Sequence, residues 1–246
     1  TATDDELLAY LRDYPPHLQR AFRNHMVTTA LSAIVSGILS DGATAAGKPG
    51  LVVELIGAAD DVVSAQYSQQ LWAIAQQVQA SPALTAAFAD GVSGIGARIE
   101  ALGGDDAAAF RLAFAAFIAT HGHRGPNDWE LSSRTWENTP ELAYAAIDRM
   151  RLSTRDLSPH ERVADTEQVR AAAAAQVLPS LKGLDKANFR KALKAVQWWS
   201  RGRESTRDLA VRVSNPTRRV FFELARRAAE RGGVTELRDV AMLDAR

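Results

Sequence analysis

Cysteine is absent from the 246 residues of the chain. Disulfides, thiolate metal sites and cysteine nucleophiles are therefore excluded, and a reducing cytoplasm is the compartment that this composition favours. Runs of alternating β-branched residues are missing as well, whereas alanine is abundant and glycine and proline fall at segment ends. These features predict an all-α fold with almost no strand.

A membrane-spanning run and a secretory signal are not expected either. The charge-free stretch Asn24–Ser40 is shorter than the ~20 largely apolar residues that a bilayer requires, and Ser, Thr, His and Asn dilute it. We therefore expect it to form a buried helix. The first residues, TATDDELLAYL, are acidic and lack the basic region of a signal peptide. These observations predict a cytoplasmic protein with no membrane partner.

Net charge is zero, but the positive charge is concentrated near the C-terminus. Residues 182–238 hold 15 of the 29 Lys and Arg residues and only 6 of the 29 acids. Such a segment could attract nucleic acid, an anionic small molecule or an acidic neighbouring domain. Nucleic acid is the weakest of the three, because acids are interleaved with the basic residues and no known motif frames them. We therefore expect no nucleic-acid partner.

Local signals divide the chain into helices. Thr3 followed by Glu6 forms a capping pattern, and Pro15 closes the short helix that it opens. The dipeptide Asn215–Pro216 is expected to break the last long helical segment. We predict helices at about 3–14, 16–43, 60–80, 82–90, 92–102, 105–122, 139–152, 159–177, 185–213 and 216–231. They would form an irregular multi-helix bundle, a single helical domain over residues 1–246, with a long ordered loop at 122–138.

The sequence HGHRGPNDWELSSRTW, residues 121–136, interrupts the helical pattern. A loop of this length inside a compact domain is more often functional or firmly ordered than idle. We expect its apolar residues, among them Trp129 and Trp136, to anchor it on the core. The loop is therefore the first candidate for a functional site.

Two interpretations of the polar residues in this loop remain open. In the structural one, His123 and Arg124 neutralise a helix C-terminus while Asp128 and Glu130 accept hydrogen bonds from loop amides. In the functional one, the same side chains contact a ligand, because binding residues often lie on loops held by a rigid scaffold. A metal site that also included His121 matches no strong ligand spacing, so we expect no metal.

A second departure lies in KANFRKALKAVQWWSRGRESTRDLAVRV, residues 186–213. At ~100° per residue, one helix face carries Phe189, Leu193, Val196, Ser200, Arg203, Arg207 and Val211 in order. Arg203 and Arg207 are therefore expected on the core face, where a buried guanidinium needs an anionic partner. Glu204 and acids of the loop would serve, and a bound phosphate or carboxylate would serve equally well.

Taken in order, these segments resemble a known family. GHRGPNDWELSSRTW resembles the GHRG-x-x-[DE]-x-[DE]-L-x-x-x-x-W signature of the middle helical domain in phosphoenolpyruvate-utilising enzymes, especially rifampicin phosphotransferase and other phosphoenolpyruvate synthase-like chains. RESTRD is similar to their R-E-x-x-K segment, and RRVFFELARRAAERGGVTELRDVAMLD is similar to the stretch that follows. The resemblance extends over roughly residues 50–244.

The resemblance implies a multidomain parent. Such enzymes join an ATP-grasp domain, a middle domain and a swivelling domain whose histidine carries the phosphoryl group. The sequence shows neither a glycine-rich nucleotide loop nor a phosphohistidine segment, so the domain alone would not be catalytically complete. Its implied partners are a small-molecule substrate and the flanking ATP-grasp and phosphohistidine domains. No cofactor is expected in this domain, whereas ATP and Mg²⁺ are implied for the missing ones.

The resemblance also implies site residues. His123, Arg124 and Glu130 match the loop motif, and Arg203, Glu204 and Arg207 match the helix motif, so all six would bind substrate. No catalytic residue is assigned with certainty, and His123 is the candidate base. Position 207 is Arg where the family usually has Lys, which exchanges a flexible point donor for a planar fork.

Two functions are therefore carried forward. The first is an acceptor-binding domain that holds a hydroxyl-bearing or anionic substrate for phosphoryl transfer by a separate phosphohistidine domain. The alternative is a non-catalytic scaffold domain in a multidomain protein. That protein could be one in which the scaffold is coupled to an NAD-dependent epimerase/dehydratase-like domain.

Overall fold

The computed structural model describes residues 2–57, 63–153 and 159–233. Within these ranges the chain is helical and contains no strand, which confirms the all-α prediction. The α-helices are α1 (Asp4–Asp13), α2 (Pro15–Ala45), α3 (Val52–Ile56), α4 (Val63–Ala80), α5 (Pro82–Ala89), α6 (Ile95–Ala101), α7 (Asp105–His121), α8 (Glu141–Arg151), α9 (Pro159–Val177) and α10 (Gly183–Glu230). Two short 3₁₀ helices, η1 (Pro49–Leu51) and η2 (Leu178–Ser180), complete the described elements.

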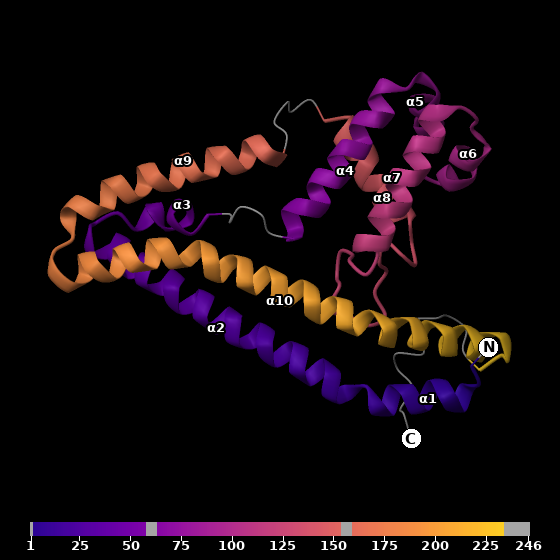
Figure 1. Cartoon of the computed structure of the whole chain (residues 1–246), viewed down its shortest axis with the longest axis horizontal. Coiled ribbons are helices and arrows are strands. Elements are labelled where there is room, and N and C mark those ends of the chain that lie inside the picture. The colour runs from indigo at the N-terminus through magenta and orange to yellow at the C-terminus, as the bar shows by residue number, and fades with distance from the viewer. Residues whose placement is uncertain (1, 58–62, 154–158, 234–246) are drawn as a thin grey trace.

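Helices α2 and α10 lie side by side and antiparallel, and they form the long axis of the molecule (Figure 1). Helices α3 and α9 lie along one end of this pair, and α4 to α8 form a separate group near the other end. The chain between α7 and α8 descends from that group onto α10. The loop predicted at 122–138 therefore joins the two parts of the molecule.

Apolar side chains form two separate cores. The first lies among α4 to α8 and includes the buried residues Leu71, Val78, Leu84, Phe88, Ile95, Ile99, Phe110, Phe117 and Ile147. The second lies among α2, α3, α9 and α10 and includes Val35, Leu39, Leu55, Val177, Phe189 and Val196. In this second core a Cβ at Gly42 would overlap the Phe189 ring, so the glycine permits the close approach of α2 and α10.

Local capping at the N-terminus is as predicted. The Thr3 hydroxyl accepts a hydrogen bond from the Glu6 amide at 3.3 Å, and the Glu6 carboxylate accepts one from the Thr3 amide at 2.7 Å. Helix α1 also contacts the far end of α10, where Asp4 lies 2.7 Å from Arg227 and 2.9 Å from Arg231. The capping box and these ion pairs fix the orientation of α1.

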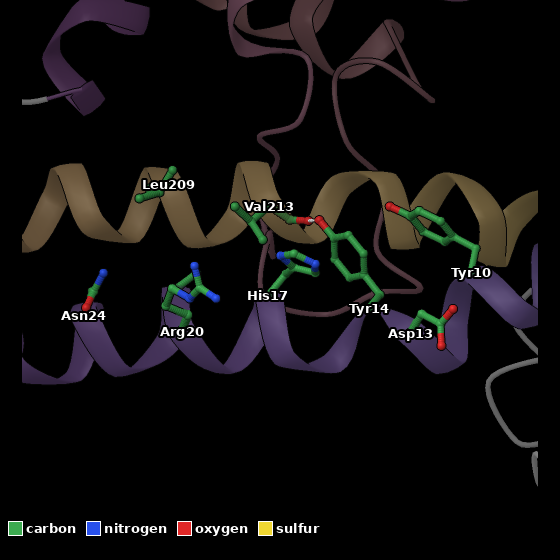
Figure 2. A pocket seen from close by; sticks show the side chains of 9 residues that line it. Tyr10, Asp13, Tyr14, His17, Arg20, Asn24, Leu209 and Val213 are labelled. Atoms are coloured by element: carbon green, nitrogen blue, oxygen red, sulfur yellow. Dashed lines mark hydrogen bonds between the residues drawn. The ribbon is translucent and has the colours of Figure 1, made fainter.

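The predicted break at Asn215–Pro216 is wrong, because α10 continues through Pro216. Proline cannot donate to the carbonyl four residues before it and crowds the preceding turn. Tertiary contacts stabilise this turn: the Tyr14 hydroxyl donates to the Val213 carbonyl (Figure 2), and the Ser214 hydroxyl donates to the Ala210 carbonyl at 2.8 Å. The sequence rule for proline therefore does not hold at this turn, where Tyr14, between α1 and α2, and Ser214 bond to carbonyls of α10.

The prediction that Asn24–Ser40 is buried is only half right. Its large apolar side chains Met26, Val27 and Ile34 are 62%, 59% and 60% exposed, because α2 is covered on one side only. By length and composition, the described segment Asp4–Ala45 could also cross a membrane. A core helix of a soluble protein satisfies the same criteria, so this property alone is weak evidence for a membrane.

Candidate functional site

In the loop between α7 and α8, the second half of the backbone lies against the first half and is hydrogen-bonded to it. The Trp136 amide donates to the Arg124 carbonyl at 2.9 Å, and the Glu137 amide donates to the Gly122 carbonyl at 2.9 Å. A Cβ at Gly125 would overlap the Arg134 carbonyl oxygen and lie 3.0 Å from the Thr135 Cα. The second glycine of GHRG is thus required by the close approach of two backbone segments.

Aromatic side chains anchor the loop on both parts of the molecule. Trp136 packs on the first core with its ring centroid 4.9 Å from that of Phe117, as predicted. Trp129 contacts α2 instead, with centroids 5.2 Å from Phe22 and 5.2 Å from His25, and remains partly exposed.

Arg218 of α10 lies beneath the loop and is almost completely buried, with 1% of its surface exposed. Its guanidinium donates to the carbonyls of Asp128 at 2.8 Å and Glu130 at 3.2 Å, and to the Asn215 side chain at 3.2 Å. Burial lowers the pKa of Arg218, and nearby acids partly oppose that shift. Arg218 was not predicted as a site residue, because its partners in the loop are backbone carbonyls, which leave no signal in the sequence.

Asp208 of α10 is the anion that meets the GHRG segment. Its carboxylate lies 2.9 Å from His123 Nε2, 3.5 Å from Arg124 and 3.1 Å from Arg212. Burial alone would raise the pKa of Asp208, but the hydrogen bond from His123 and the surrounding cationic groups outweigh burial and lower it. Asp208 was not predicted as a site residue, although it is the last residue of the RESTRD segment and lies four residues before Arg212.

Asp128 forms a second buried anionic centre. Its carboxylate oxygens lie 2.9 Å from Arg124 Nε and 3.1 Å from Arg207, whose guanidinium also lies 5.8 Å from the Trp129 ring centroid. Of the partners left open for Arg207, an acid or a bound anion, the structure shows an acid of the loop. We call the seven side chains His123, Arg124, Asp128, Arg207, Asp208, Arg212 and Arg218 the junction network.

His121 lies beside the junction network but does not join it. Its ring is 2% exposed and packs against Phe117 and Tyr67, with centroids 5.5 Å and 6.1 Å away. Neither ring nitrogen has a hydrogen-bond partner among the described residues. Burial lowers the pKa of His121, so the neutral ring is favoured in the folded protein.

Two cavities adjoin the network where the loop crosses α10. The larger, about 820 Å³, is lined by loop residues Ser132, Arg134, Thr135, Glu137, Asn138 and Thr139 and by Asn215, Arg218, Arg219, Phe222, Glu223 and Arg226 of α10. The smaller, about 290 Å³, is lined by His123, Arg212 and neighbouring residues. Glu137, Asn215 and Arg219 line both cavities, so the two adjoin. Asn215 donates to the Glu137 carboxylate at 2.8 Å, and Arg219 pairs with the same carboxylate.

Residues 4–207 match the family described as rifampicin phosphotransferase fourth domain. The chain belongs to this family. It is therefore a phosphotransferase-related domain, as the GHRG and RESTRD motifs predicted. A comparison with curated proteins finds no match.

The family match begins earlier and ends earlier than the predicted range of about 50–244. It includes α1 and α2 but ends at Arg207, so Asp208, Arg212 and Arg218 lie beyond it. The stretch 234–246, which contains the sequence DVAMLD, lies outside the described residues. Asp60 and Asp61, expected at the start of a helix, lie outside them too.

The structure brings only some of the predicted site residues of this family member together. His123, Arg124 and Arg207 lie within the junction network. The Glu130 carboxylate is exposed and accepts hydrogen bonds from the Ser132 amide and hydroxyl at 3.3 Å and 3.2 Å. Glu130 therefore accepts a hydrogen bond from a loop amide, as in the structural interpretation, whereas the Asp128 carboxylate pairs with Arg124 and Arg207.

The predicted burial of Arg203 is wrong. Arg203 is exposed and its guanidinium lies 3.2 Å from the carboxylate of the adjacent Glu204. No residue of α10 between Val196 and Asp208 is buried. The helix periodicity was correct, but from 197 to 207 α10 has no buried residue, and of the two arginines on the stripe only Arg207 meets the loop.

Among the described residues, no group of three or more His, Asp or Glu side chains has an arrangement that could hold a metal ion. In the junction network, each of the two carboxylates, Asp128 and Asp208, is instead paired with basic side chains. This arrangement orders the loop, positions His123 and leaves Arg219 and Arg212 lining the cavities.

Proposed function

We propose that this chain is the acceptor-binding domain of a phosphotransferase. It would hold a small hydroxyl-bearing substrate in the two adjoining cavities while a separate phosphohistidine domain delivers the phosphoryl group. ATP and Mg²⁺ would act in an ATP-grasp domain of the parent protein. Membership of the rifampicin phosphotransferase fourth-domain family supports this proposal.

The observation that carries the proposal is the pairing of His123 with Asp208 at the wall of a cavity. A carboxylate on one imidazole nitrogen fixes the orientation of the ring and stabilises the imidazolium that forms when the other nitrogen accepts a proton. His123 is therefore suited to take the proton from an acceptor hydroxyl as the oxygen attacks phosphorus and the P–N bond to the phosphohistidine breaks, which releases the imidazole of the separate domain. Arg212 and Arg219 add positive charge on the same cavity wall, where phosphoryl oxygens would carry negative charge.

The remaining residues of the predicted site divide into two groups. Arg124 and Arg207 hold Asp128 and so position the loop. Glu130, Arg203 and Glu204 do not line either cavity, so their proposed contact with substrate has no geometric support. For these three, the resemblance alone carries the expectation of substrate binding.

Rifampicin, the compound in the family's name, is the first probe. We expect it to quench tryptophan fluorescence of the chain saturably, and Arg219→Ala to weaken this binding by about tenfold, the loss of one charge-assisted contact. Arg203→Ala is the matched control, because it removes an exposed arginine of the same helix that lines neither cavity. Equal affinity of the wild type and Arg219→Ala would contradict the placement of the acceptor.

The role of His123 is tested by transfer rather than by binding. In the parent protein, His123→Gln should lower the rate of phosphoryl transfer to the acceptor by about 10²-fold or more, with little change in acceptor affinity. If His123→Gln lowers affinity and leaves the transfer rate unchanged, then His123 binds the acceptor and is not the base.

The scaffold alternative makes a different prediction. The charges of the junction network largely satisfy one another, as they would in a purely structural ion network. A scaffold would bind a flanking domain but would give no thermal shift with rifampicin or other hydroxyl-bearing small molecules. Such a result would favour the scaffold over the acceptor-binding function.

A further inference from the structure

Helix α2 presents an apolar stripe on the side away from α10. Met26, Val27 and Ile34 are each more than half exposed, and Ala30 and Gly37 are exposed between them. At ~100° per residue these five positions fall within about 60° of Ala30. The buried residues of α2, which include Ala21, Ser32, Val35 and Leu39, fall on the opposite side. In the described part of the chain, no other helix lies along this outer side of α2 (Figure 1).

An exposed charge stands at each end of the stripe. Arg23 precedes it and Asp41 follows it, and no residue from 24 to 40 is Asp, Glu, Lys or Arg. The two residues are 18 positions apart, which corresponds to five full helical turns, so both lie on the line of the stripe. Within residues 2–57, 63–153 and 159–233, neither side chain forms an ion pair.

The order of Arg23, the apolar stripe and Asp41 along α2 allows two copies of the helix to pair in opposite directions. If two copies of α2 pair antiparallel about position 32, Arg23 of one copy meets Asp41 of the other. The same register places Val27 against Gly37 and Ala30 against Ile34, so these two large side chains each face a small one, while Met26 faces Ile38. A parallel pairing would place Arg23 against Arg23 and Asp41 against Asp41, and like charges at an interface oppose association.

We propose that the outer face of α2 is a self-association surface, on which a second copy of this chain binds antiparallel. The contact is isologous, as in a two-fold dimer, and the two Arg23–Asp41 pairs set its register. An anionic lipid surface fits less well, because helices that lie on membranes carry Lys and Arg beside the apolar face, whereas Asp41 would be repelled. The proposal does not depend on the acceptor-binding function.

The oligomeric state of the chain tests this proposal. Sedimentation equilibrium should show a reversible dimer for the wild type. Arg23→Asp and Asp41→Arg should each raise the dimer Kd by at least about tenfold, because each creates two like-charge contacts. The double variant carrying both changes should regain the wild-type Kd, since the reversed pairs are again opposite in sign. Arg190→Asp, at an exposed position of α10, is the matched control and should leave the Kd unchanged.

The absence of cysteine allows the direction of pairing to be measured. Ala30→Cys and Ile34→Cys chains should cross-link to each other when mixed, whereas Ala30→Cys alone should cross-link poorly. Circular dichroism would check that each variant remains helical, as expected for exposed positions.

Three outcomes would overturn the proposal. The first is a wild type that stays monomeric at every concentration, and the second is efficient cross-linking of Ala30→Cys with itself. The third is a monomer that binds vesicles of phosphatidylcholine and phosphatidylglycerol and loses that binding in Ile34→Asp. That last result would assign the stripe to lipid.

Discussion

Asp208 is the residue on which most of the charge balance at the loop depends. It is 6% exposed and compensates His123, Arg124 and Arg212 at once. A buried charge that loses its partner is costly because it stays desolvated without compensation. A single carboxylate therefore couples the loop to α10.

The Asp208→Asn substitution keeps the shape of the side chain and removes its charge. We expect the free energy of unfolding, measured with urea at pH 7, to fall by about 3–5 kcal/mol, because Arg124 is left without one of its partners. The folded state lowers the pKa of Asp208, so its contribution is present above the ordinary Asp value of 3.8 and is lost as the pH falls through the lowered pKa. The difference between the variant and the wild type should therefore shrink in acid.

Asp185→Asn provides the comparison for that measurement. It removes an acid from the first turn of the same helix, at an exposed position, and should cost less than about 1 kcal/mol. An Asp208→Asn variant no less stable than Asp185→Asn would show that the junction network contributes little.

His121 should make the protein acid-sensitive. Burial lowers its pKa, so folding favours the neutral ring, and stability is lost as the pH falls from the ordinary value of 6.5 through the lowered pKa. His121→Leu should flatten the dependence of unfolding free energy on pH in this window, by at most about 1.4 kcal/mol per pH unit for one group. His17→Gln, at an exposed position, should keep the wild-type slope. An unchanged slope in His121→Leu would mean that other groups cause the acid sensitivity.

At the scale of single elements, the glycines of GHRG determine how the loop packs. Gly125→Ala would push a Cβ against the Arg134 carbonyl oxygen and the Thr135 Cα, both of which are backbone atoms. We expect a loss of about 1–3 kcal/mol and faster hydrogen exchange of the Trp136 and Glu137 amides, whose bonds close the loop. Gly50→Ala, where nothing lies within 4 Å of an added Cβ, should change neither quantity. Equal exchange rates in the two variants would contradict the packing argument.

Local signals predicted most of the helices, and non-local contacts explain where they failed. The Thr3 capping box and the acidic first turn of α7 depend on residues close in sequence, and both were found as predicted. Next to Pro216, where α10 continues against the local rule, the Val213 carbonyl accepts a hydrogen bond from Tyr14, which lies far away in sequence. The site follows the same rule: an acid of the loop was one of the partners considered for Arg207, but Asp208 and Arg218 bind partners 85 to 95 positions away. No periodicity reports such a pairing.

At the scale of the whole molecule, the burial of side chains changes along α10 because the apolar residues form two cores and not one. Phe189 and Val196 belong to the second core, whereas Ala210 and Val211 are buried beyond the interval from 197 to 207 that has no buried residue. The prediction that Arg203 is buried required one continuous core along the stripe, and α10 does not have one. The loop and its charges join the two parts of the molecule, and α4 also contacts α9 and α10 directly.

This architecture predicts two unfolding units. Leu84→Ala in the first core and Leu39→Ala in the second should each cost about 2–5 kcal/mol, since both residues are fully buried. Each should speed hydrogen exchange mainly in its own group of helices: α4 to α8 for Leu84→Ala, and α2, α3, α9 and α10 for Leu39→Ala. Adding Asp208→Asn should widen the separation of the two transitions in calorimetry, because it weakens the contact that couples them. A single sharp transition in every variant, with exchange increased equally throughout, would mean that the loop and its buried ions unite the two cores into one cooperative unit.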